Sequence, residues 1–164
     1  MAGHRNIGSA QSQSFSKAER LNSKKLMDEL FNKGSSFVLY PFRVYWMKHE
    51  QPVPSKVQVL ISVPKKNFPL AVDRNRIKRL MREAYRKNKF LIIDSMNGNE
   101  KNLAVAFLFT GKNLSPQNLT PNPSLKQRGM ATQKKSSVKN LPQYKLVEEK
   151  MIEALNQLSK NSLK

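Results

Sequence analysis

The sequence predicts an α+β sandwich, in which a small mixed sheet of about four strands packs against about three helices, and three patterns indicate this fold. Apolar and polar residues alternate along 42–47 and again along 57–63, which is the period of strands with one buried face. Segment 103–109 is apolar throughout, as expected of a buried central strand. A helical apolar stripe lies between the second and third of these strands, so helices and strands alternate along the chain.

The elements around these strands follow from the same periodicities. Segment 49–56 contains Pro52 and Pro54 and is predicted to be a hairpin connection between the first two strands. A short helix ending at Gly34 precedes the strands, and its apolar face consists of Leu26, Met27, Leu30 and Phe31. A final helix is predicted over 144–159, with an apolar face made of Val147, Met151, Ala154, Leu155 and Leu158.

The helix between the strands is strongly basic. Its buried stripe has the spacing i, i+3, i+4, i+7 and i+8 and consists of Ile77, Leu80, Met81, Ala84 and Tyr85. The opposite face carries Lys78, Arg79, Arg82 and Arg86. Asp73 is the predicted N-cap, because its carboxylate can accept hydrogen bonds from the first free amides. Segment 74–89 holds eight Lys or Arg residues against the single Glu83, so pairing within the helix cannot neutralise this face.

The whole composition has the same sign. The chain carries 30 Lys and Arg residues against 11 Asp and Glu residues, a formal charge of +19, which favours a polyanionic partner such as nucleic acid. No long apolar run predicts a membrane span, and segment 1–14 lacks the apolar core of a signal peptide, so we expect a cytoplasmic protein without a membrane partner. The absence of Cys excludes disulfides, thiolate zinc sites and cysteine nucleophiles.

No catalytic residue and no metal ligand is predicted in this chain. A protein nuclease needs clustered carboxylates for metal ions or well-placed histidines for proton transfer. The two histidines are His4, in a predicted tail, and His49, in the predicted hairpin connection. The acidic residues are scattered, and neighbours such as Asp28 and Glu29 diverge on a helix.

The chain is predicted to form a single domain over 15–160. Segment 1–14 is expected to be a disordered basic tail. Segment 111–142 is rich in Pro, Asn, Ser, Gln and Lys and has few large apolar residues, so burial cannot offset its ordering entropy. It is expected to be a flexible low-complexity insertion.

Three motifs in order resemble the protein subunit of bacterial ribonuclease P. They are Phe15-Ser16-Lys17-x-x-Arg20-Leu21, Ser62-Val63-Pro64-Lys65-Lys66, and Arg74-Asn75-Arg76-x-Lys78-Arg79-x-x-Arg82-Glu83. The likeness covers 15–109 and resumes in the last helix. It implies that the basic helix crosses between two parallel strands in the left-handed sense, against the usual preference for right-handed connections.

The resemblance also implies a function. Proteins of this family assist a catalytic RNA subunit, an endoribonuclease that removes the 5′ leader of precursor tRNA, with Mg2+ bound mainly by the RNA. Carried over residue by residue, the RNA-subunit-binding positions are Lys65, Lys66, Arg74, Asn75, Arg76, Lys78, Arg79 and Arg82. The positions that would line a cleft for the single-stranded leader are Arg20, Met27, Phe31 and Tyr45.

General physical chemistry supports a leader cleft independently of the resemblance, because unpaired nucleotides bind aromatic platforms flanked by cations. Phe31 shares a helix face with Met27 and Leu30, so an ordinary core role is an equal alternative for it. Three features differ from the family pattern: the turn at 67–70 is longer by about one residue, Met27 stands at a commonly aromatic position, and segment 112–142 is longer than expected.

Two other functions fit parts of the sequence. A noncatalytic structural RNA-binding protein, such as a ribosomal protein or an RNA chaperone, would share the charge and size. An amphipathic helix that binds a membrane surface or a partner protein would share the dense basic face of 74–89, but the strands on either side predict that its apolar face is already covered by a sheet.

Overall fold

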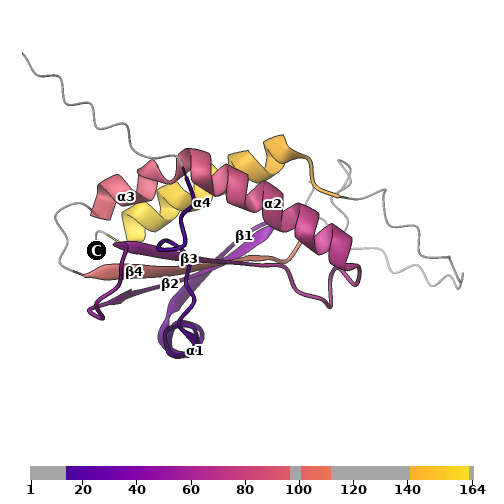
Figure 1. The fold of residues 1–164 in the computed structure, drawn as a ribbon. Helices are drawn as coiled ribbons and strands as arrows, with labels where there is room; N and C mark the ends of the chain where they lie inside the picture. Colours follow the sequence, from indigo (N-terminus) through magenta and orange to yellow (C-terminus); the bar gives the residue numbers. More distant parts are fainter. Residues whose placement is uncertain (1–13, 97–100, 112–140, 163–164) are drawn as a thin grey trace, which may run out of the picture.

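The computed structural model describes residues 14–96, 101–111 and 141–162. The predicted tail at 1–14 and insertion at 111–142 lie almost wholly outside these residues. One mixed sheet of four strands, in the order β1-β2-β4-β3, is covered by helices on both faces (Figure 1). In chain order the elements are α1 (Lys24–Lys33), β1 (Ser35–Leu39), β2 (Phe42–His49), β3 (Val57–Ser62), α2 (Ala71–Asn88), α3 (Phe90–Met96), β4 (Asn102–Phe109) and α4 (Tyr144–Ser162).

β4 is one of the two inner strands of the sheet, in agreement with its predicted central position. It pairs antiparallel with β2 and parallel with β3. The predicted hairpin between β2 and β3 is wrong, because β4 lies between these two strands. β4 is apolar on both faces, and pairing on both edges buries its backbone as well as its side chains. The parallel pairing of β3 with β4 makes α2 and α3 a crossover connection, and its left-handed sense stays a prediction of the family resemblance.

The sheet separates two apolar clusters. α2, α3 and α4 cover one face, and α1 covers the other (Figure 1). The larger cluster lies under α2 and α4 and includes Val105 and Phe107 of β4. The smaller lies under α1 and includes Ala104 and Ala106 of the same strand. The two β4 side chains on this second face are small, which leaves room for the leucines of α1.

α1 has the predicted apolar face and the predicted end. Its N-cap is Ser23, whose hydroxyl accepts a hydrogen bond from the Leu26 amide at 3.4 Å. It ends at Gly34, which has φ −70° and therefore does not need a glycine's left-handed conformation. A Cβ there would lie 2.3 Å from the Leu30 carbonyl oxygen and 3.1 Å from that of Trp46, so close backbone approach requires the glycine.

Two helical predictions need correction. α2 begins at Ala71, its N-cap is Leu70, and no side chain caps it. Asp73 is therefore in the first turn, where its charge still suits the positive end of the helix dipole. α3 was not predicted, so four helices are described rather than three.

α4 agrees with its prediction, and Val147, Met151 and Leu158 are fully buried. None of the helices in the described ranges is both long and apolar enough to cross a membrane.

Candidate nucleic-acid interface

The basic helix is buried on one side and open on the other, as predicted. Ile77, Met81, Ala84 and Tyr85 are fully buried, and Leu80 packs at the margin of the same cluster. On the outer side the exposed residues are Asn75, Arg76, Arg79 and Arg82, and Lys78 is half-buried. The packed apolar stripe prevents rotation of α2 about its axis, so these cations are presented in a defined direction.

The helix has one internal ion pair, at its C-terminal half. Glu83 accepts two hydrogen bonds from Arg86, at 2.9 Å and 2.7 Å, and this pairing lowers the pKa of the Glu83 carboxyl. Within the described part of the chain, Arg76, Arg79 and Arg82 form no ion pair with any carboxylate. Their charge is therefore available to a polyanion.

Arg74 differs from the other arginines of the motif. Its Nη1 donates hydrogen bonds to the carbonyl oxygens of Phe68 and Pro69, at 2.8 Å and 2.7 Å. These carbonyls belong to the connection between β3 and α2, so the guanidinium is directed toward the protein's own backbone. A structural role for Arg74 was not predicted.

The predicted lysine pair follows the carboxyl end of β3. Lys65 and Lys66 are both exposed. Their loop is closed by the Phe68 amide, which donates to the Pro64 carbonyl at 3.2 Å, and the Asn67 side chain ties it to the Thr110 carbonyl at 3.1 Å. Because this loop leads directly into α2, the lysines lie at the end of the sheet where the basic helix begins.

A second candidate surface lies between α1 and the sheet. Phe31 of α1 and Tyr45 of β2 meet edge to face, with ring centroids 5.1 Å apart. Met27, like Tyr45, packs at the margin of the smaller apolar cluster under α1. Phe31 is 40% exposed whereas Leu26 and Leu30 are fully buried, so the alternative of a core role for Phe31 is wrong. The structure thus brings together three of the four predicted leader-binding residues.

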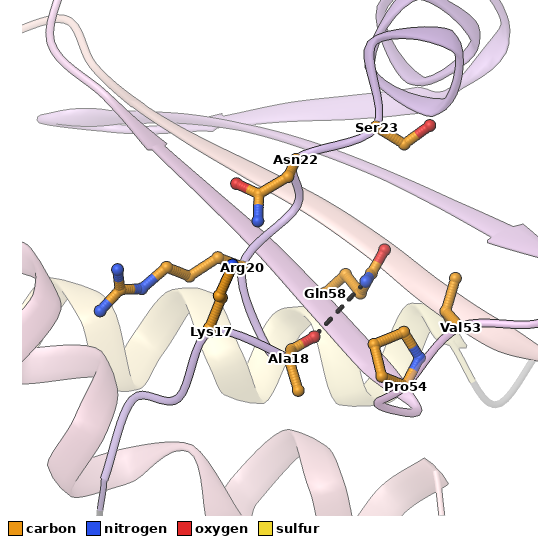
Figure 2. A pocket seen from close by; sticks show the side chains of 8 residues that line it. All are labelled: Lys17, Ala18, Arg20, Asn22, Ser23, Val53, Pro54 and Gln58. Atoms are coloured by element: carbon orange, nitrogen blue, oxygen red, sulfur yellow. Dashed lines mark hydrogen bonds between the residues drawn. The ribbon is translucent and has the colours of Figure 1, made fainter.

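Arg20, the fourth, lies elsewhere. Its guanidinium sits 5.4 Å from the centre of the Phe15 ring, and Phe15 packs against Tyr85 of α2, whereas the Phe31–Tyr45 pair lies on the α1 side of the sheet. Figure 2 shows the Arg20 side chain extending away from Val53 and Pro54.

Arg20 also borders a shallow pocket of about 450 Å³ at the start of α1. The Gln58 side chain donates to the Ala18 carbonyl across it at 3.4 Å (Figure 2). The residues around the pocket are Lys17, Ala18, Arg20, Asn22, Ser23, Val53, Pro54 and Gln58. Its lining surface is mostly apolar.

Arg43, which was not among the predicted site residues, lies beside the aromatic pair. Its guanidinium lies 5.6 Å from the centre of the Tyr45 ring. The sequence could have indicated this position, because Arg43 and Tyr45 are two residues apart on one predicted strand and therefore point to the same face.

No metal centre is formed by the residues that the structure describes, since they contain no group of three or more His, Asp or Glu side chains able to hold an ion. His49 is 8% exposed at the end of β2, not in a hairpin. Burial lowers its pKa, and Glu29 opposes that shift.

These features define a basic α+β protein with an exposed cationic helix face on one side of the sheet and an aromatic pair flanked by an arginine on the other. The ribonuclease P family model matches residues 15–100. The ribonuclease P protein component of Porphyromonas gingivalis is 39% identical over 99 residues, which are 60% of this chain and 72% of that protein. That of Chlorobium phaeobacteroides is 40% identical over 105 residues, covering 58% of this chain and 72% of the relative.

A solved structure shows the same fold. The ribonuclease P protein from Thermotoga maritima superposes with a TM-score of 0.55 at 22% identity, over 85% of this chain and 96% of that one. The chain belongs to the ribonuclease P protein component family. It is therefore a component of a tRNA-processing ribonucleoprotein and has an RNA partner, and the reading as a ribosomal protein or RNA chaperone is not favoured.

Proposed function

We propose that this protein binds the catalytic RNA subunit of ribonuclease P through α2 and the 5′ leader of precursor tRNA through the cleft beside α1. The observation that carries the proposal is the set of exposed arginines on α2, Arg76, Arg79 and Arg82, which have no carboxylate partner in the described ranges. A packed helix with unneutralised guanidinium groups is suited to phosphates, which arginine binds in a planar, two-pronged geometry.

Lys65 and Lys66 extend this RNA-binding surface. They lie in the loop just before α2, so an RNA backbone that contacts the first turns of α2 can contact the lysines as well. Asn75 is exposed between the arginines and can donate to phosphate or to a base edge. Arg74 is left out of the proposed RNA contacts, because its guanidinium already binds backbone carbonyls.

The cleft suits the leader because it combines exposed aromatic surface with a cation. Stacking of one unpaired base on an aromatic side chain contributes about 1–3 kcal/mol and does not depend on base identity. Phe31 and Tyr45 offer that surface, and Arg43 places a positive charge beside them. Met27 replaces a flat ring with a polarizable thioether, which can still pack against a base.

The hydrolytic chemistry is assigned to the RNA partner. His49 is buried, and the acidic side chains of the described residues are not grouped for metal binding. Mg2+ ions held mainly by RNA phosphates would activate the attacking water. The protein's contribution is to bind and orient the substrate, and we place this activity in the cytoplasm.

Reconstitution tests the proposal. Purified protein freed of RNA is expected not to cleave precursor tRNA, whereas protein with its cognate catalytic RNA should cleave at the junction of leader and mature tRNA when Mg2+ is present. A variant with Arg76, Arg79 and Arg82 all changed to Ala should bind the RNA subunit much more weakly. Cleavage by the RNA-free protein, or unchanged RNA affinity in the triple variant, would contradict this division of roles.

A further inference from the structure

The face of the sheet beside α1 continues beyond the aromatic pair. The pairing of the strands places Val38 of β1 directly opposite Arg43 of β2, and Arg43 opposite Leu108 of β4. Directly opposed residues on neighbouring antiparallel strands have Cα atoms about 5 Å apart. The next row along the strands contains Tyr45 and Ala106. Arg43 is therefore the next residue after Tyr45 along this face of β2, and Val38 lies beside Arg43 on β1.

In this neighbouring row, the side chains of Val38 and Arg43 are exposed to solvent. α1 packs its buried leucines over Ala104 and Ala106, and Val38 is 67% exposed. Val38 belongs to an edge strand and alternates with Phe37 and Leu39, which pack against the cluster on the opposite face. A large apolar side chain and an exposed cation thus lie side by side at the rim of the cleft.

Arg43 has no internal role that explains its position. Its one described contact is with the Tyr45 ring, and none of the carboxylates in the described ranges pairs with it. Arg43 is exposed, so its donors can reach a ligand while its Cζ stays 5.6 Å from the centre of the ring. An arginine held by an aromatic ring loses less freedom on binding a phosphate than a mobile lysine would.

We propose that Arg43 and Val38 extend the leader-binding cleft toward β1, so that the leader leaves the Phe31–Tyr45 pair across these two residues. Arg43 binds a backbone phosphate, and Val38 supports the sugar or base of the adjoining nucleotide. This inference rests on the proposed function of the cleft. A single strand is the occupant because unpaired cation and aromatic surface alternate here, which complements a chain of alternating phosphates and bases.

The test is a series of precursor tRNAs whose leaders are lengthened one nucleotide at a time, with affinity measured for the holoenzyme reconstituted from each protein variant. With the native protein, affinity should rise with leader length until the path is filled. Arg43→Ala should match the native protein for short leaders and bind the longer ones about three- to fivefold more weakly, as expected for one exposed charge contact. The plot of affinity against leader length should therefore reach its plateau at a shorter leader with Arg43→Ala than with the native protein.

Two further variants test the role of charge and position, and a third is a control. Arg43→Lys retains the charge without the planar fork and should give a smaller loss for the longer leaders. Val38→Glu places a carboxylate directly opposite Arg43 on an exposed site, and should reproduce the early levelling without unfolding the protein. Lys145→Ala removes one exposed charge from α4, on the opposite face of the sheet, and should leave the whole curve unchanged.

The outcomes separate the extension from the cleft itself. If Phe31→Ala lowers affinity for leader-bearing precursor and not for mature tRNA, while Arg43→Ala has no effect or an equal effect at every length, the extension is overturned and the cleft stands. If Phe31→Ala weakens precursor and mature tRNA equally, the leader site itself is contradicted. Circular dichroism of each variant confirms that the fold is retained.

Discussion

His49 shows how burial changes the chemistry of a single side chain. Both ring nitrogens are buried, and neither has a hydrogen-bond partner among the described atoms. Protonation would place an unpaired charge in this environment, and accordingly burial lowers the pKa of the imidazole. Glu29 acts in the opposite direction and is the weaker influence. The residue is suited to a neutral structural role and not to proton transfer in catalysis.

A pH dependence of stability follows. Because the pKa of His49 is lower in the folded than in the unfolded chain, the unfolded chain binds more protons once the pH falls below about 6.5. The contribution of His49 is thus fully present above that pH and is lost as the pH falls further. Denaturant unfolding between about pH 7.5 and pH 5 should show this loss, and His49→Gln should reduce it. Parallel curves for the two proteins would assign the pH dependence to other groups.

The arginines of α2 lie in two different surroundings. The 74–76 motif occupies one turn, yet Arg74 binds the carbonyls of Phe68 and Pro69 whereas Arg76 is exposed. No side chain caps this helix, so the ordered connection ahead of it is held in part by Arg74. Two chemically identical side chains, separated by about 200° around the helix, consequently have different surroundings, and we expect different roles for them.

This division predicts opposite phenotypes. Arg74→Ala should lower the free energy of unfolding by about 1–2 kcal/mol, because two carbonyl oxygens lose a charged donor. Arg76→Ala should leave stability unchanged, weaken RNA-subunit binding, and reduce the slope of log affinity against log salt by about 0.7–0.9. Denaturant melts and filter binding over a salt series measure both properties. Loss of stability in Arg76→Ala with a native-like Arg74→Ala would reverse the assignment.

Three parts of the chain that are distant in sequence meet at one place: segment 14–21, strand β3 and the C-terminal end of α2. Lys89, just after α2, donates to the Ser14 carbonyl and to the Glu19 carboxylate, both at 2.6 Å. Backbone hydrogen bonds from Val59 to Glu19 and from Leu21 to Val59 attach the same segment to β3. Phe15 packs edge to face on Tyr85, with ring centroids 5.3 Å apart. Segment 14–21 thereby joins the edge of the sheet to the C-terminal end of the basic helix.

The Lys89–Glu19 pair should dominate the stability of this junction. Its side chains are 8% and 15% exposed, so Lys89→Met leaves a nearly buried carboxylate without its cation, at a cost of about 3–5 kcal/mol. Lys101→Met is the matched control, because Lys101 and Glu50 are 55% and 77% exposed and such pairs contribute about 0–1 kcal/mol. Thermal and denaturant unfolding measure both.

The double variant Lys89→Met with Glu19→Gln should recover part of the loss, since no buried charge then remains. Equal effects of Lys89→Met and Lys101→Met would show that the pair near α2 is not a structural link.

Much of the fold could be predicted from the sequence because it depends on the local periodicity of apolar residues. The buried stripes of α2 and α4, the apolar face of α1 and the central position of β4 all follow from the spacing of apolar residues. The exposed basic face of α2 follows from the same spacing. Capping and termination are less certain from sequence, as the start of α2 at Ala71 shows, because Asp73 is favourable both as a cap and within the first turn.

Contacts between segments far apart in the chain were set by packing. Periodicity places Arg43 and Tyr45 on one face of β2, but whether Phe31 stands over them depends on how α1 crosses the sheet. Likewise Arg20 and Arg74 match the family motifs, while their guanidinium groups are oriented by Phe15 and by two backbone carbonyls. Spacing along a chain specifies which face a side chain occupies, whereas its partner on that face depends on the relative placement of whole elements.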